Sequence, residues 1–579
     1  MKSDGKLIGT ICVALLTTVV LASVAGCGLG KTKGQQGNTG ILPVAVEEPE
    51  GGVALTFHGD GTFAFSNDNR FFTDTVKVLM AAPAGSRVFY TLDGSEPDKT
   101  DLEYKGGFTF DPVAGEFPDA YVLRAKALFS DGTWSKTAAG TYFVAENVKE
   151  RYSTLVFSIS GEPEELTEMP DGIFAGNNFE ERGKDSERKV YIEMINPDGT
   201  GEISQFGGIR IFGGYSRENS IKSMKLFSRA SYDADHKNFK LSNFGTPKLD
   251  GSDRIITKYD KMVLRNAGND FQYCFLRDEL SQTLCKNAGF EVYEAVLPAV
   301  AYLNGKYYGL FWLHENYCDK YFKEKFGNDA KGEFVILEGS EQEKDHDNDE
   351  LTEKYVKEYN SKYKEFAERD MTDDGNFEAL WQFLDVENYL NYFAWNIALN
   401  NGDWPNNNYK CYRYVPVEDD TKSEGVFDGR WRFLPHDMDF SYGIYGMDKT
   451  LPDFDTLGIV TDPSNERYAP LFAQLMKRKD CRDYFYDKSI EYITGVLSEM
   501  GIKMTYWELD DSRKAELYMF YKYISQLMQK GDTSLWCTED FYPVAESFIL
   551  AFAEHRQEHL IRQMDSYFGT FGDKPRGGN

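Results

Sequence analysis

The chain has 579 residues, of which 41% are hydrophobic and 15% aromatic, so it can bury large cores but is too long for one ordinary domain. Its formal net charge is −29. A surface this acidic repels phosphate backbones, which excludes nucleic acid as a partner and favours solubility, cation binding or basic protein partners.

The first 27 residues have the pattern of an export signal. Lys2 and Lys6 precede an apolar run at residues 7–24, and residues 25–27 read Ala-Gly-Cys. A charged start, an apolar stretch and small residues before a cysteine resemble the signal peptide and lipobox of a bacterial lipoprotein. The resemblance implies that Cys27 carries lipid and holds the protein, outside the cytoplasm, at the cell membrane. An uncleaved spanning helix is the alternative, but the run is barely long enough and glycines end it at once.

Residues 28–51 are rich in Gly, Lys, Gln and Glu and predict a flexible tether. No later stretch is long and apolar enough to predict a membrane span. Six cysteines remain after Cys12 and Cys27, and none forms a C-x-x-C pair. A structural zinc site is therefore not expected, and up to three disulfides are left open. These six are Cys274, Cys285, Cys318, Cys411, Cys481 and Cys537.

Residues 52–146 predict a small all-β sandwich. Short strands are expected at residues 76–80, 87–92, 121–129 and 141–144, with polar turns between them. The runs VFYTLDGSEP, ending at Pro97, and LRAKA, ending at Ala127, resemble the β-sandwich module appended to chitobiases and hexosaminidases. Such a module would act as a spacer, which we favour, or would contact cell-wall glycan through exposed aromatic side chains at Phe71, Phe72 and Trp134.

Residues 150–570 begin with strands and turns and become helical. A helix is expected to begin near Phe271, capped by Asn269 or Asp270 and ended by Gly289. The turn Asn304-Gly305 predicts a hairpin. Further elements follow from hydrophobic spacing: strands at 209–212, 223–227, 261–265, 334–337 and 410–415, one helix at 377–399, and helices across 480–568.

Two acidic blocks carry the chemistry. Asp403 and Asn408 have the D-x-x-x-x-N spacing of a kinase catalytic loop, and a later strand ends in Asp437 and Asp439. In phosphoryl transfer, a carboxylate deprotonates the accepting hydroxyl, while an amide oxygen and a second carboxylate hold a metal ion. The spacing alone is common. Its position after a capped helix, a hairpin and a further helix makes the pattern more specific.

Several motifs together resemble the spore coat protein H (CotH) kinase-like family over nearly all of residues 150–570. The resemblance implies an α+β atypical protein-kinase fold, so the chain is expected to be multidomain, with a disordered tail at 571–579. The motifs are FGGYSR at 212–217, IKSMKL at 221–226, LRNAGND at 264–270 with Arg277-Asp278, the hairpin at 305–315, and the acidic blocks at 403–409 and 433–443.

The same resemblance implies transfer of a phosphoryl group from ATP to serine or threonine of a protein, with Mg or Mn as cofactor. Asp403 would be the catalytic base. Asn408 and Asp437 would bind metal, with Asp439 as a further ligand or an orienting group.

A lysine would contact the nucleotide phosphates in such a site. Lys222 is the first candidate for this catalytic and ATP-binding role, and Lys225 is close enough to be the residue that fills it. A carboxylate would pair with the lysine, and the sequence leaves Asp278, Glu279 and Glu315 open. A non-catalytic surface scaffold for adhesion, or for binding glycan or protein, is the second interpretation. The presence of three side chains able to bind a metal ion, Asp403, Asn408 and Asp437, favours catalysis.

Overall fold

The computed structural model describes residues 43–577 apart from 328, 339–348, 419 and 537. The predicted signal segment, Cys27, most of the tether and the last two residues of the tail lie outside this part of the chain. Within it, no helix is long and apolar enough to cross a membrane. The five cysteines it includes all have free thiols, so no disulfide forms among Cys274, Cys285, Cys318, Cys411 and Cys481.

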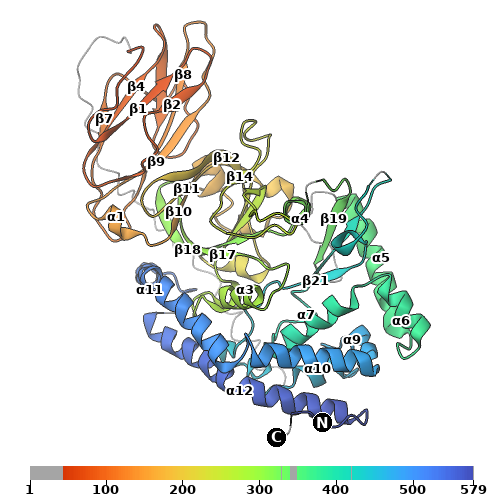
Figure 1. Cartoon of the computed structure of the whole chain (residues 1–579). Coiled ribbons are helices and arrows are strands. Elements are labelled where there is room, and N and C mark those ends of the chain that lie inside the picture. Colours follow the sequence, from red (N-terminus) through yellow and green to blue (C-terminus); the bar gives the residue numbers. More distant parts are fainter. Residues whose placement is uncertain (1–42, 328, 339–348, 419, 537, 578–579) are drawn as a thin grey trace.

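The N-terminal part is a sandwich of two β-sheets (Figure 1). One sheet has the strand order β2-β1-β4-β7 and the other β3-β9-β8-β5-β6. Apolar side chains of both sheets meet in one core, among them Val53, Leu55, Val78, Val88, Leu123 and Tyr142. The strands are β1 (Gly52–Phe57), β2 (Phe63–Phe65), β3 (Phe71–Phe72), β4 (Val76–Ala81), β5 (Arg87–Thr91), β6 (Leu102–Glu103), β7 (Phe108–Phe110), β8 (Tyr121–Leu128) and β9 (Ala138–Val144).

The aromatic side chains expected to be exposed on this sandwich are not. Phe71 is fully buried, and its ring packs against Phe143 and Tyr152. Trp134 is half-buried beside Phe89, and Phe72 is also half-buried. Phe71 therefore cannot belong to an exposed aromatic platform, because its ring forms part of the contact with the next part of the chain.

A closed seven-stranded barrel follows the sandwich, in the order β10-β11-β12-β13-β16-β18-β17. Neighbouring strands are antiparallel except β10 and β17. The predicted hairpin is present: Asn304 and Gly305 both have positive φ, as a two-residue turn requires. The strands are β10 (Leu155–Ser160), β11 (Arg188–Ile195), β12 (Gly201–Ile211), β13 (Met224–Phe227), β16 (Lys261–Arg265), β17 (Val296–Leu303) and β18 (Lys306–Glu315); β14 (Phe239–Lys240) pairs with β15 (Lys258–Tyr259) outside the barrel.

A separate three-stranded sheet, the second sheet, and a helical region follow the barrel. β20 (Lys410–Val415) lies between β19 (Glu333–Glu338) and β21 (Arg432–Leu434), and helices pack beyond them (Figure 1). The helices are α1 (Val148–Arg151), α2 (Pro163–Leu166), α3 (Arg277–Asn287), α4 (Asp319–Phe326), α5 (Asp349–Glu368), α6 (Asp374–Trp381), α7 (Val386–Ala398), α8 (Thr456–Thr461), α9 (Pro470–Leu475), α10 (Lys479–Thr494), α11 (Glu499–Gln529) and α12 (Tyr542–Gly569).

Two helix predictions are wrong in detail. The helix expected from Phe271 begins only at Arg277, because Gln272 and Phe275 have positive φ. The carboxylate of Asp270 accepts hydrogen bonds from the Cys274 and Arg277 amides instead of capping a helix directly after it. The single helix expected at 377–399 is two helices, α6 and α7, and Asp385 caps the second.

The sandwich is docked on the barrel through buried polar contacts. Arg70 Nε lies 2.9 Å from Glu193 Oε1 of β11, and both side chains are almost fully buried. Arg124 donates to the Ser160 carbonyl at 2.6 Å. Because each partner of a buried ion pair needs the other to offset its desolvation, these contacts hold the two parts in one fixed arrangement.

Replacing Glu193 with alanine should lower the free energy of unfolding by about 3–5 kcal/mol, because Arg70 would stay buried without its partner. Urea unfolding measures this loss. The exposed pair Lys136–Asp235 also joins sandwich and barrel, so Lys136→Ala is the matched control and should leave the midpoint unchanged. Equal midpoints for Glu193→Ala and the wild type would contradict a docking role for the buried pair.

Candidate functional site

A polar cleft of about 370 Å³ lies where the barrel meets the three-stranded sheet. Its first wall comes from the barrel edge at which β12 and β16 end and β13 begins, since Ile211 pairs with Met224 and Met224 with Leu264. The opposite wall comes from the edge at which β19 and β21 end and β20 begins, since Lys410 pairs with both Glu338 and Leu434. Strand ends of two sheets thus face one another across the cleft.

The cleft brings together most of the predicted site residues. Its lining includes five of them, drawn from the barrel, the loop after α7 and the segment after β21: Lys225, Asp403, Asn408, Asp437 and Asp439. Lys222 and Glu315 do not line it.

The loop at residues 212–217 covers the barrel side of the cleft. Gly213 has φ +102°, a conformation that favours glycine. Arg217 holds the loop from inside, because its Nε donates to the Gly213 carbonyl at 2.9 Å and its Nη2 to the Ile211 carbonyl at 3.0 Å. The arginine of the FGGYSR motif is thus a support for the loop.

Strand alternation decides between the two candidate lysines. Ser223 and Lys225 are two residues apart and both line the cleft, so Lys222 faces the other way. The Lys222 ammonium donates to the carbonyls of Arg217 and Asn219, both at 2.9 Å. It also lies 3.9 Å from the centre of the Phe179 ring. Burial lowers the pKa of Lys222 to about 8.

Glu338 is a carboxylate of the cleft lining that was not predicted from the sequence. Glu338 Oε2 lies 3.5 Å from Lys410 Nζ, and the charge of Lys410 lowers the pKa of Glu338, with a smaller contribution from Lys225. Glu315 instead accepts hydrogen bonds from the Tyr259 hydroxyl and the Ala295 amide in the barrel interior. The predicted part of Glu315 in ATP binding, as the partner of the lysine, has no support from this position.

The other two carboxylates left open for the lysine also have different partners. Glu279 lies 2.7 Å from Arg513 of α11. Asp278 lies 3.0 Å from Arg265, the last residue of β16. Neither lines the cleft.

Asp403 and Asn408 are directly linked. Asp403 Oδ2 accepts hydrogen bonds from the side-chain amides of Asn407 and Asn408, both at 3.0 Å. Since Asn408 uses its Nδ2 in this contact, its Oδ1 is the atom left to bind a cation. Burial raises the pKa of Asp403, and the charge of Asp437 adds to the rise against the Asn407 hydrogen bond. A carboxylate with a raised pKa is a stronger base.

Asp437 and Asp439 share one guanidinium. Arg265 Nη2 donates to Asp437 Oδ1 and, at 2.9 Å, to Asp439 Oδ2. Burial alone would raise the pKa of Asp437, but Arg265 outweighs it and lowers the pKa. Burial and the charge of Asp437 raise the pKa of Asp439 well above its usual range. The two acidic residues of the D-x-D block are therefore not equivalent.

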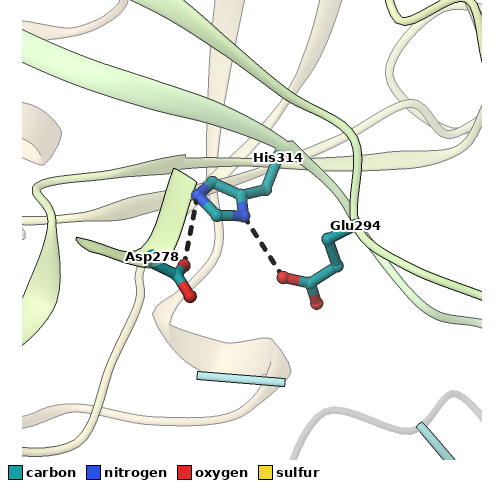
Figure 2. Close-up of side chains that lie close together, drawn as sticks. All are labelled: Asp278, Glu294 and His314. Carbon is teal, nitrogen blue, oxygen red and sulfur yellow. Dashed lines mark hydrogen bonds and ion pairs between the residues drawn. The ribbon is translucent and has the colours of Figure 1, made fainter. Parts of the chain in front are cut away.

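A group of metal-ligating residue types lies behind this pair. One ligand atom from each of Asp278, Glu294 and His314 lies within 4.8 Å of the others, and all three are buried. Figure 2 shows the His314 ring between the two carboxylates. His314 Nδ1 lies 3.2 Å from Glu294 Oε2, and Nε2 lies 3.7 Å from Asp278 Oδ2. One ion cannot coordinate both nitrogens of the ring, so the ring is better described as a bridge between the two carboxylates.

Glu294 continues the bridge towards the cleft. Its second carboxylate oxygen lies 3.2 Å from His436 Nδ1, and His436 lines the cleft beside Asp437. Burial opposes ionisation of Glu294, but the charges and hydrogen bonds of the two imidazoles outweigh burial and lower its pKa. The sequence signal for this network was weak, because its members come from four separate segments.

A base candidate beside an amide, an acidic pair and a lysine around one cleft define a kinase-like set of side chains. Residues 209–513 match the model of the CotH kinase protein family. Because the match spans more than half of the 579 residues, the chain belongs to this family. The matched span is shorter than the residues 150–570 indicated by the motifs. A comparison with curated proteins gave no match.

The two lysines give a matched test of the cleft. Lys225→Ala should weaken ATP binding about tenfold or more, because a charge-assisted contact to phosphate is lost. Lys222→Ala should leave ATP affinity within about twofold, but should lower the free energy of unfolding by about 2 kcal/mol, because its two buried hydrogen bonds disappear. Calorimetric titration and urea unfolding measure the two effects. The reverse pattern would place the phosphate contact at Lys222.

Proposed function

We propose that this chain is an extracytoplasmic lipoprotein, anchored through Cys27, whose CotH domain transfers a phosphoryl group from ATP to serine or threonine of a protein. One observation carries the catalytic part: Asp403, Asn408, Asp437 and Lys225 line the same cleft. These residues come from three separate parts of the chain: β13 of the barrel, the loop after α7 and the segment after β21.

Asp403 would act on the accepting hydroxyl. It accepts the hydroxyl proton as the acceptor oxygen forms its bond to the γ-phosphorus, and the bond from that phosphorus to the β–γ bridging oxygen breaks. The products are the phosphorylated protein and ADP, and the proton remains on Asp403. Asn407 and Asn408 hold the carboxylate in place through their amides.

The donor set around Asp437 fits Mg or Mn. Carboxylate and amide oxygens are the ligands these ions prefer, and Asp437 and Asn408 Oδ1 supply one of each kind. The Arg265 contact keeps Asp437 in the ionised form that a ligand needs. A bound divalent ion would neutralise charge on the nucleotide phosphates.

The phosphates would lie towards the barrel. Lys225 of β13 and the glycine-containing loop at 212–217 form that wall, and Arg217 fixes the loop conformation. Lys225 would offer a positive charge to the phosphates, while loop amides near Gly213 would allow close approach of the main chain.

The remaining parts of the proposal rest on the N-terminal region. The lipid anchor is supported by the sequence pattern at residues 1–27. A spacer of the chitobiase-associated type is supported by the two-sheet fold of residues 52–146 and by its buried attachment to the barrel through Arg70 and Glu193. A spacer fixed in this way, joined to the lipid by the flexible tether at residues 28–51, would keep the cleft away from the membrane surface.

Asp403→Asn should lower kcat by roughly 10²–10⁴-fold, since the proton acceptor is lost while the shape of the side chain is kept. The full-length protein, incubated with labelled ATP and MgCl₂ or MnCl₂, is assayed for phosphate on its own serine and threonine residues and on added proteins. Asp511→Asn, the same change on the exposed surface of α11, is the control and should keep full activity.

Transfer that is equal in Asp403→Asn and the control would contradict the assigned base. No transfer by the wild type with either metal and any acceptor would favour the second interpretation, a non-catalytic scaffold that binds protein or glycan at the surface.

A further inference from the structure

Three carboxylates surround the buried guanidinium of Arg265. Its Nη1 donates to Asp278 Oδ2 at 3.0 Å, and its Nη2 donates to Asp439 Oδ2 at 2.9 Å and to Asp437 Oδ1. Arg265 is 7% exposed and also lines the cleft. A fixed positive charge therefore lies inside the acidic block that the sequence assigns to metal binding.

Asp439 has its oxygens occupied. Besides Arg265, Asp439 Oδ2 accepts from the Asn269 amide at 2.8 Å, and Oδ1 accepts from Asn269 Nδ2 at 3.1 Å. The side chain is fully buried. The main chain also packs closely against it, since a Cβ atom at Gly268 would overlap Asp439 Oδ2. An ion at Asp439 would have to compete with these three donors in a fully buried position, whereas Asp437 is 25% exposed.

We propose that the cleft binds a single divalent ion, through Asp437 and Asn408, and that Arg265 takes the place that a second ion would occupy. Asp439 is then a positioning residue that holds Arg265 and not a metal ligand. This inference rests on the proposed function for the presence of the metal site. The inference goes beyond the proposed function because it gives the number of ions and the role of each acidic residue.

The surroundings of Arg265 fit a permanent cation. Asp278, its third partner, also accepts the Met438 amide on Oδ1 at 3.1 Å, so the guanidinium is tied to the chain between the two acidic residues. Asp278 in turn lies beside His314, which contacts Glu294 (Figure 2). The other oxygen of Glu294 contacts His436. This network leads back to the residue before Asp437. A guanidinium anchored on several sides cannot leave when metal is scarce, whereas a bound ion can.

Two carboxylates separated by a single residue, Met438, explain the need for such a cation. Buried carboxylates repel each other unless a positive group lies between them. Arg265 contacts both Asp437 and Asp439 from one nitrogen, which is the bridging position. It leaves the second oxygen of Asp437 for the ion in the cleft.

Metal stoichiometry tests this inference without reference to activity. Mn²⁺ binding to the full-length chain is measured by the electron paramagnetic resonance signal of the free ion, with and without a non-hydrolysable ATP analogue. We expect one tight ion per chain. Asp437→Asn should weaken it at least about tenfold, since a charged ligand becomes neutral. Asp439→Asn, which keeps one oxygen for Arg265 and Asn269, should change its affinity less than about threefold.

Arg265→Met is the complementary variant, and its thermal melting shows whether it folds. If it folds, its binding stoichiometry should rise to two, because both acidic residues become available to ions. If Arg265→Met does not fold, the comparison of Mn²⁺ affinity between Asp439→Asn and Asp437→Asn still tests the inference. Two tight ions on the wild type, or loss of the ion in Asp439→Asn, would overturn the inference while leaving phosphoryl transfer intact. No Mn²⁺ binding by the wild type would overturn the proposed metal-dependent function as well.

Discussion

The buried contact of Arg265 with three carboxylates fixes how the two halves of the cleft lie. Arg265 ends a barrel strand, whereas Asp437 and Asp439 follow the last strand of the second sheet. Removing one partner from such a cluster leaves a buried charge uncompensated, so the cluster tolerates little movement. The barrel edge and the edge of the second sheet are therefore held in a fixed relative position. This constraint places Lys225 and Asp403 in the same cleft.

The parts of the site that the sequence predicts are those governed by local rules. The strand at 410–415 and the Asn304-Gly305 hairpin follow from alternation and turn chemistry, and both are present. The spacing of Asp403 and Asn408 puts both on one short loop, where their side chains bond directly. The choice between the lysines was not settled by the sequence, which put Lys222 first; in the structure Lys225 lines the cleft with Ser223 and Lys222 does not.

The parts that escaped prediction depend on contacts between distant segments. Hydrophobic spacing continues across residues 382–385, so it does not show that Asp385 starts a new helix. The late start of α3 follows from the buried pair of Asp270 with Arg277, which holds the preceding turn away from helical geometry. Glu338 gave no local signal. Its place at the cleft follows from the pairing of β19 with β20, which puts the end of one strand beside the start of the other.

Backbone conformation adds a reason why the two proposed metal ligands are Asn and Asp. Asn408 has φ +55° and Asp437 φ +48°, both in the left-handed region. Apart from glycine, Asn and Asp are the residues that enter this region most readily, since their short polar side chains bond locally. An alanine at either position would add backbone strain to the loss of a ligand atom. Asp437→Asn keeps this backbone preference and removes the charge, so it separates metal binding from loop geometry, whereas Asn408→Asp would also remove the Nδ2 donor that Asp403 accepts.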